Sequence, residues 1–310
     1  MRWVTVRHQG GERPGLAVDE TVRLLAGEEQ LGDLLGDDGE RLRAAAERAT
    51  AAPLDVIALD GADLAAPLRP PQIRDFLTFL DHLRNAGRAA NMELNAVWHE
   101  IPAFYFSNAA AVVGPYDPVH ISPGCERFDF ELEVAAVIGR AGSNLAPSDA
   151  DGHIAGFMIL NDWSARDVQI NEMQLMLGPA KGKDGANTLG PWFVTVDELE
   201  PYRHDGGYRL EMKAFVNDDQ VSSGSLDQMD WSWADMVAYA SRGTHLRPGD
   251  VIGSGTVPSG CLLEAAALDG DDFRGFLRPG DEVRLEVEGL GATRQKVLEP
   301  LPLHPLRTGH

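Results

Sequence analysis

The stretch that decides the fold covers residues 128–139 and reads Phe-Asp-Phe-Glu-Leu-Glu-Val-Ala-Ala-Val-Ile-Gly. Its alternation predicts a strand with Asp129, Glu131 and Glu133 on one face. The strand continues into residues 134–138, which are apolar throughout and indicate burial on both faces. Carboxylates at the mouth of a buried strand need a cation or several hydrogen bonds to stay ionised. The stretch therefore predicts a buried strand that ends in a charged site.

A further acid occupies the same kind of place elsewhere in the chain. Asp162 follows the apolar run of residues 154–160 and precedes Ser164. A set of ligands made only of oxygen atoms suits Mg²⁺, Ca²⁺ or Mn²⁺ rather than zinc. The two pieces together predict a hard-metal site.

Composition is that of an ordinary globular protein and excludes several classes of partner. The chain has 310 residues, of which 44% are hydrophobic and 24% charged. Its net charge of −21 would repel nucleic acid and an anionic membrane surface. The sequence contains no apolar run approaching the ~18 residues of a membrane span and no signal-peptide pattern at the N-terminus, so we expect a cytoplasmic protein. Cys125 and Cys261 lack a CxxC partner, which excludes a zinc ribbon and favours two free thiols in a reducing compartment.

The chain divides by composition into two parts. Residues 1–68 contain a strand pattern at 3–6 and an Ala-rich helix at 42–52. The Pro-rich segment 66–71 cannot be helical, so we place a domain boundary at about residue 68. Residues 69–310 form the second domain, in which irregular Gly- and Pro-rich connections replace the strand–helix alternation of a doubly wound sheet. We expect helices mainly at 74–90, 165–177 and 232–241, and strands at 104–107, 128–138, 154–161, 192–196, 209–216, 250–254, 261–268 and 282–287.

Polar residues next to these strands form a second pattern. Ser164 followed by Asp167 is typical of a capping box, so a helix should begin at about Ala165. Arg166 and Gln169 then share one helical face that starts beside the predicted metal site. Alone, such a pair would more often be a surface arginine and an exposed glutamine.

Two further segments carry candidate catalytic groups. Asp75 and His82 are seven residues apart, which on a helix places both on one face. A lone histidine there would more often be structural. The Gly-rich loop 178–192 carries Lys183 without the spacing of a phosphate-binding loop. A lysine close to a carboxylate cluster is better explained as an electrophilic or charge-balancing group.

Four motifs occur in order and together resemble the fumarylacetoacetate hydrolase family. They are Glu-Leu-Glu at 131–133, Asn-Asp-Trp-Ser-Ala-Arg-Asp-Val-Gln at 161–169, Lys-Gly-Lys-Asp at 181–184 with Gly-Pro-Trp at 190–192, and Ser-Gly-Thr at 254–256. The resemblance covers roughly residues 70 to 300 and leaves the first 68 residues out. It implies an α+β, mainly β fold: the family's mixed β-roll, with strands around the site and helices outside, after a small α/β N-terminal domain. It also implies a homodimer.

The resemblance implies a metal site of four acids. Glu131, Glu133 and Asp162 match the family's ligands for Mg²⁺ or Ca²⁺, with Mg²⁺ as our first expectation. Asp75 matches an earlier aspartate of the fumarylacetoacetases. Asp129, on the same strand face, is expected to be a bystander.

The resemblance also implies a catalytic set. His82 matches the catalytic histidine, Glu264 is the candidate for its partner glutamate, and Lys183 matches the catalytic lysine. The smaller acylpyruvate hydrolases carry their glutamate three residues after the histidine, where this chain has Asn85. Met173 stands where fumarylacetoacetases have a further tyrosine, which leaves the substrate open. The positions that match substrate or intermediate contacts are Arg166, Gln169, Tyr105 and Thr256.

These correspondences imply a metal-dependent hydrolase that cleaves a C–C bond in a β-diketo acid of the fumarylacetoacetate, fumarylpyruvate or acylpyruvate type. His82 would activate water for this reaction. Members of the family also decarboxylate, isomerise or hydrate 2-oxo acids on the same metal site, so those reactions stay open. A non-catalytic protein that binds a metal or ligand is a further alternative.

Overall fold

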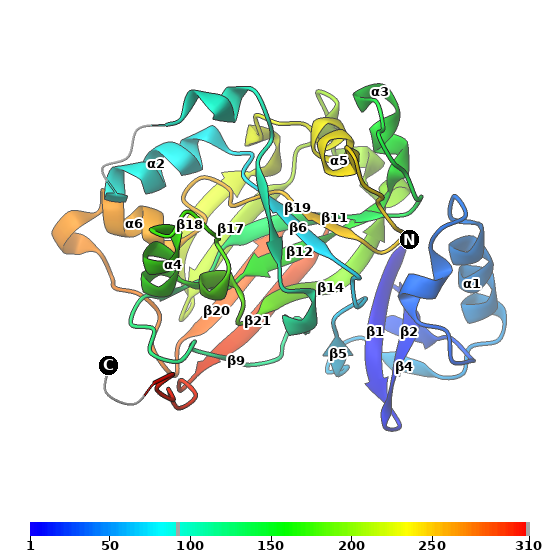
Figure 1. Ribbon diagram of the computed structural model, residues 1–310. Helices are drawn as coiled ribbons and strands as arrows, with labels where there is room; N and C mark the ends of the chain where they lie inside the picture. Colours follow the sequence, from blue (N-terminus) through cyan, green and yellow to red (C-terminus); the bar gives the residue numbers. More distant parts are fainter. Residues whose placement is uncertain (91–93, 308–310) are drawn as a thin grey trace.

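Two β-sheets lie against each other at the centre of the protein, and helices lie outside them (Figure 1). The computed structural model describes residues 1–90 and 94–307. This arrangement confirms the predicted mainly β architecture with mixed sheets. Among the described residues, no helix combines the length and apolar content needed to cross a membrane.

The larger sheet has 12 strands within the described part of the chain. Its order is β4 (Val56–Ala58), β3 (Thr21–Leu24), β2 (Gly11–Val18), β1 (Arg2–His8), β14 (Asn187–Thr195), β12 (Ile154–Asp162), β11 (Leu132–Ile138), β19 (Val251–Gly253), β6 (Ile73–Phe76) and β7 (Phe104–Ser107), with β5 (Leu64–Ala65) paired to β1 and β8 (Val112–Val113) to β14. The second sheet has the order β18 (Asp219–Ser225), β17 (Glu211–Val216), β20 (Glu282–Val287), β21 (Gly291–Leu298) and β9 (Val119–His120). Short pairs are β10 (Phe128–Asp129) with β13 (Ser164–Ala165), and β15 (Arg203–His204) with β16 (Gly207–Tyr208).

Helices connect and cover these strands. The α-helices are α1 (Glu40–Ala51), α2 (Leu80–Ala90), α3 (Pro147–Ala150), α4 (Arg166–Met173), α5 (Trp233–Ser241) and α6 (Leu262–Leu268). Short 3-10 helices are η1 (Leu31–Leu34), η2 (Ala96–His99), η3 (Ala109–Ala111), η4 (Asp151–His153), η5 (Lys181–Lys183), η6 (Val196–Tyr202), η7 (Leu226–Gln228) and η8 (Gly270–Asp272). Helices α2 and α6 pack on each other.

Strand β11 is buried on both faces, as its sequence predicts. Leu132 and Val134 lie in the core between the two sheets, together with Met212 from β17 and Leu285 from β20. Ala135 points to the opposite core, which α1 and the N-terminal strands complete. Because fully burying one large aliphatic side chain contributes ~1.5–3 kcal/mol, these two cores fix the strand firmly in place.

The N-terminal residues form the predicted strand, as β1, and the predicted Ala-rich helix, as α1, and their sheet joins that of the rest of the chain. Strand β1 pairs with β14 in a register that sets Arg2 opposite Val194 and Trp3 opposite Phe193. Helix α1 packs on β2 and β3. The sheet therefore runs across the division at residue 68, and that division stays a prediction.

The sequence assignment was wrong around the first candidate histidine. Residues 74–90 were expected to be one helix, but residues 73–76 form β6, and α2 begins only at Leu80. Strand β6 pairs with both β19 and β7 and is fully buried, so sheet pairing prevails over local helix propensity. Asp75 and His82 therefore do not share a helical face.

The predicted strand at 261–268 is also wrong, because Leu262–Leu268 form helix α6. Its sequence, Leu-Leu-Glu-Ala-Ala-Ala-Leu, consists of strong helix formers. The backbone N–H groups of Leu262 and Leu263 donate to the carboxylate of Asp129, which satisfies donors that a helix start leaves free. A short apolar run does not distinguish a strand from such a helix.

Two boundaries near the site differ from the sequence reading. The expected strand 128–138 is interrupted after Asp129 and resumes at Leu132. The predicted capping box is absent: Ser164 pairs in β13, its hydroxyl donates to the Asp162 carbonyl, and Ala165 precedes α4 without a side-chain cap. Asp167 instead accepts the backbone N–H of Glu126.

Candidate functional site

Three buried carboxylates from three strands of the larger sheet meet in one place. Asp75 belongs to β6, Glu133 to β11 and Asp162 to β12, and one oxygen from each lies within 4.8 Å of the others. Strand β19 separates β6 from β11 and passes the cluster at Gly253. A Cβ at Gly253 would lie 2.4 Å from Asp75 Oδ1, so glycine leaves the room that this carboxylate occupies. The order of strands in the sheet thus brings the three acids together.

Glu131 lies beside this cluster and faces two cations. Lys183 Nζ lies 2.5 Å from Glu131 Oε2 and 2.5 Å from Asp162 Oδ2. Arg166 Nη2 lies 2.8 Å from Glu131 Oε1. Burial alone would raise the pKa of Glu131, but Lys183, Arg166 and His82 hold it well below its usual range.

The pKa values of the three clustered acids are shifted in the opposite direction, upwards. Burial, together with Asp75 and Glu131, raises the pKa of Asp162 to about 8 against the opposing charge of Lys183. Burial and the nearby Asp75 raise the pKa of Glu133 well above its ordinary value, and burial also raises the pKa of Asp75. The cause is a low-dielectric interior in which the acids outnumber the cations.

The donor set fits a hard divalent cation. Asp75 Oδ1 and Asp162 Oδ1 are buried and have no hydrogen-bond partner in the described part of the chain. Buried polar atoms normally have partners, so these two oxygens fit the coordination of a cation. Tyr105 covers the other oxygens, with its hydroxyl 3.0 Å from Asp75 Oδ2 and against Asp162 Oδ2. Carboxylate oxygens are the ligands that Mg²⁺, Ca²⁺ and Mn²⁺ prefer.

A histidine–glutamate pair lies next to the carboxylates. His82 on α2 places Nδ1 2.7 Å from Oε1 of Glu264 on α6. The second oxygen of Glu264 accepts hydrogen bonds from Asn85 Nδ2 and from the backbone N–H of Ser259, each at 2.9 Å. Because Glu264 is fully buried, these contacts fix its orientation. The other ring nitrogen of His82, Nε2, is then available to accept or donate a proton.

Asp129 lies outside the carboxylate cluster, as the sequence analysis expects, but it has structural contacts that the sequence did not indicate. It is fully buried, and Arg166 donates to its Oδ2 from Nε at 2.9 Å. The N–H groups of Leu262 and Leu263 donate to the same carboxylate at 2.8 and 3.0 Å. Asp129 thereby connects the arginine beside Glu131 to the first turn of the helix that carries Glu264. The break after β10 turns it away from the metal cluster, which alternation in the sequence could not reveal.

The remaining predicted residues lie around the same centre. Thr256 Oγ1 lies 3.4 Å from Glu133 Oε1, and Gly255 N–H donates to the other oxygen at 3.1 Å. Gln169 accepts a hydrogen bond from Arg166 Nη1 at 3.2 Å, as expected for neighbours on one helical face.

Sequence reasoning missed two partners of Glu264. The backbone N–H of Ser259 leaves no signal in side-chain chemistry. Asn85 could have been found, since it stands one helical turn after His82.

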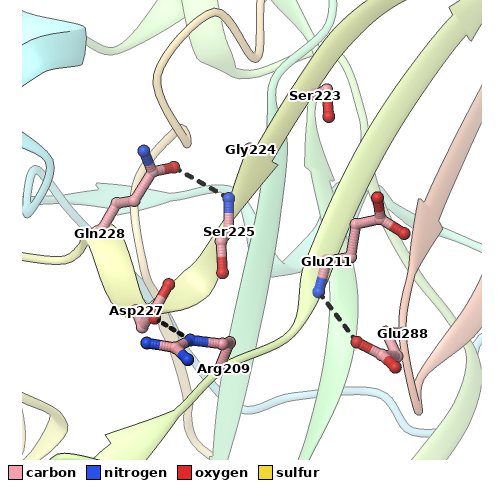
Figure 2. A pocket seen from close by; sticks show the side chains of 8 residues that line it. All are labelled: Arg209, Glu211, Ser223, Gly224, Ser225, Asp227, Gln228 and Glu288. Atoms are coloured by element: carbon pink, nitrogen blue, oxygen red, sulfur yellow. Dashed lines mark hydrogen bonds and ion pairs between the residues drawn. The ribbon is translucent and has the colours of Figure 1, made fainter.

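A separate surface hollow is a poorer candidate for the functional site. It is open, and its walls come mainly from β17, β18 and η7 (Figure 2). Its polar groups largely pair with each other: Arg209 donates to Asp227 at 2.5 Å, and Ser225 N–H donates to Gln228 at 2.9 Å. It contains none of the candidate catalytic or metal-binding residues.

Comparison with known proteins agrees with this geometry. The family model for the fumarylacetoacetate (FAA) hydrolase C-terminal domain matches residues 72–298. The mitochondrial oxaloacetate tautomerase FAHD2A of Homo sapiens is 33% identical over 267 residues, covering 84% of this chain and 78% of that protein. A fumarylacetoacetase of Oryza sativa subsp. japonica is 28% identical over 312 residues, covering 80% and 72%. The structure of a fumarylacetoacetate hydrolase from Exiguobacterium antarcticum has a TM-score of 0.75 and 25% identity, covering 96% of this chain and 99% of that one.

Proposed function

The chain belongs to the fumarylacetoacetate hydrolase family, and we propose that it is a metal-dependent hydrolase that cleaves a carbon–carbon bond in a β-diketo acid. The observation that carries this proposal is the buried His82–Glu264 pair beside the carboxylate cluster. A histidine oriented by a fixed carboxylate is the arrangement expected of a general base that activates water. The homodimer and the cytoplasmic location stay predictions.

Asp75, Glu133 and Asp162 would hold the divalent cation, with Glu131 as the further ligand that the family resemblance implies. When bound, the cation supplies Lewis-acid polarisation of the carbonyl oxygens of the diketo acid. Mg²⁺ suits this all-oxygen set, and Ca²⁺ or Mn²⁺ would also fit. Arg166 keeps Glu131 ionised and in place. We therefore assign Arg166 first the role of positioning Glu131, and only second that of a substrate contact.

His82 acts on water in the proposed reaction. Its Nδ1 faces Glu264, so Nε2 accepts the proton as the water attacks the substrate carbonyl. Glu264 stabilises the imidazolium that results, and Asn85 and Ser259 prevent the carboxylate from rotating away. His82 can then return the proton to the carbon that leaves.

Lys183 stabilises the charge that develops when the C–C bond breaks. Burial alone would lower the pKa of Lys183, but Asp162 and Glu131 hold it above its ordinary value, so the amine stays protonated. A fixed positive charge in a dry site lowers the energy of the enolate oxygen on the departing fragment. We assign Gln169, Tyr105 and Thr256 to the walls that orient the substrate.

A second candidate is tautomerisation of a small 2-oxo acid. The relative at 33% identity is named an oxaloacetate tautomerase. That reaction needs a base to move a proton between carbon and oxygen but no attacking water, so His82 and the same metal ligands would serve it.

One panel separates the two reactions. The Mg²⁺-loaded protein is incubated with acylpyruvates, fumarylpyruvate, fumarylacetoacetate and oxaloacetate, and both cleavage products and the keto–enol ratio are measured. The hydrolase proposal expects two carboxylic or oxo acid fragments per diketone consumed. Enolisation of oxaloacetate without cleavage of any diketone would replace it with the tautomerase.

Replacement of the histidine tests the base directly. We expect His82→Ala to lower turnover by about 10²–10⁴-fold, the usual contribution of a positioned general base. His245→Ala, at an exposed position, is the matched control and should keep full turnover. Equal rates in the two variants would remove His82 from the mechanism.

A further inference from the structure

A second group of metal-ligand atoms lies beside the carboxylate cluster. His82, Cys261 and Glu264 each offer one atom within 4.8 Å of the others, and all three side chains are buried. Cys261 Sγ lies 3.8 Å from Glu264 Oε1, the same oxygen that lies 2.7 Å from His82 Nδ1. A sulfur, a nitrogen and an oxygen therefore converge on one small region.

This donor set differs in kind from the all-oxygen cluster. Zn²⁺ binds cysteine sulfur, histidine nitrogen and carboxylate oxygen tetrahedrally at ~2.0–2.3 Å, which separates neighbouring ligand atoms by roughly 3–4 Å. The separation between sulfur and oxygen already lies in that range, and the contact between nitrogen and oxygen needs only a small opening. Mg²⁺ requires oxygen ligands, so a site with a thiol and an imidazole favours Zn²⁺ over Mg²⁺.

The three ligands come from the start of α6 and from α2, two helices that pack on each other. Cys261 immediately precedes α6, and Glu264 lies in its first turn, which Asp129 anchors through the N–H groups of Leu262 and Leu263. His82 comes from α2, which packs on α6. Asn85 and Ser259 occupy the other oxygen of Glu264 and leave Oε1 facing the thiol and the imidazole. Such fixed ligands reduce the reorganisation that metal binding requires.

We propose that a thiophilic divalent cation of the Zn²⁺ class binds His82, Cys261 and Glu264 and inhibits the enzyme. On binding, a bond forms between Sγ and the metal while the thiol proton passes to water. The ion separates Nδ1 from Oε1, and a water molecule completes the tetrahedral set. The inhibition rests on the proposed function, in which His82 is the base, whereas binding of the ion does not.

Binding is measured without any substrate. The Mg²⁺-saturated protein is titrated with Co²⁺, which occupies Zn²⁺ sites and gives a near-ultraviolet thiolate-to-metal charge-transfer band. We expect the band in the unmodified protein and in Cys125→Ser, the control at the half-buried second cysteine, and its loss on addition of Zn²⁺. It should be absent from Cys261→Ser and from Cys261→Ala, the second variant in case serine disturbs folding. No band in the unmodified protein, or a band that survives both Cys261 variants, would overturn the site.

Inhibition is measured with Zn²⁺ in excess Mg²⁺, and each variant is compared with its own rate without Zn²⁺. Losing a ligand should raise the half-inhibiting Zn²⁺ concentration by at least about 10–100-fold, because even outer-shell partners of metal ligands contribute that much. An unchanged half-inhibiting Zn²⁺ concentration in Cys261→Ser would place the inhibition at the Asp75 cluster. It would refute the inhibitory role of the site at Cys261. A Cys261-dependent Co²⁺ band without turnover of any tested acid would keep the ion site and reject the hydrolase. Turnover without the Co²⁺ band would keep the hydrolase proposal and reject the ion site.

Discussion

Replacing Asp129 by alanine tests whether this buried carboxylate stabilises the fold by linking Arg166 to the first turn of α6. The change removes the acceptor of Arg166 Nε and of the two N–H groups that begin α6. Arg166 would keep Glu131 as its ionic partner, so its charge would be compensated only in part. The first turn of α6 would lose the acceptor for two backbone donors.

The expected magnitude follows from these contacts. Removing one partner of a buried ion pair costs about 3–5 kcal/mol when the other charge is left without compensation. Because Arg166 keeps Glu131 as a partner, we take the lower end of that range. An orphaned buried N–H costs a further ~1–3 kcal/mol, although the two terms are not additive. We therefore expect Asp129→Ala to lower the free energy of unfolding by at least about 3 kcal/mol. Asp129→Asn keeps the shape and one acceptor oxygen, so it should lose less.

The assay is urea unfolding of the metal-free protein followed by circular dichroism, with the stability change taken from the transition midpoint and slope. The matched control is Asp60→Asn, at an exposed position, which should change stability by less than about 0.5 kcal/mol. A loss below about 1 kcal/mol for Asp129→Ala, with an unchanged slope, would refute the reasoning. The carboxylate would then contribute no net stability through these contacts.

Three further predictions concern the charges and partners of the site. Because burial and neighbouring acids raise the pKa of Asp162 to about 8, the folded state binds more protons than the unfolded state between pH 4 and 8. The thermal midpoint of the metal-free protein should therefore fall as pH rises through that window, and Mg²⁺ should restore more stability at pH 8 than at pH 6; a flat profile contradicts the shift. Lys183→Met should lower turnover by about 10²–10³-fold, as loss of an oxyanion donor does, while the exposed Lys181→Met keeps it; equal rates would assign the stabilising charge elsewhere. Asn85→Leu leaves one oxygen of Glu264 with fewer donors, which should cost about 1–3 kcal/mol in the activation free energy, measured as the ratio of kcat values; an unchanged kcat would show that Ser259 suffices.

Local patterns in the sequence predicted much of the strand content. The alternation after Phe128 predicted one central strand, because successive side chains along a strand point to opposite faces. The continuous apolar run before Asp162 predicted the other, because a strand that is buried on both faces is apolar throughout. The same rule failed at residues 261–268, where a short apolar run is a helix, and at residues 73–76, where pairing to two neighbours overrides local preference. These outcomes depend on distant partners that local periodicity does not record.

The sequence by itself determined the chemistry that is available: acids at the ends of buried strands, a histidine, a lysine and four ordered motifs that identify a family. Only the tertiary structure decided which groups meet. Strand order unites Asp75 with Glu133 across β19, while the break after β10 sends Asp129 to Arg166 and α6. Packing of α2 on α6 brings His82 to Glu264 and Cys261. The physical reason is that side-chain direction follows from local backbone geometry, whereas proximity between distant residues follows from burial of the whole chain.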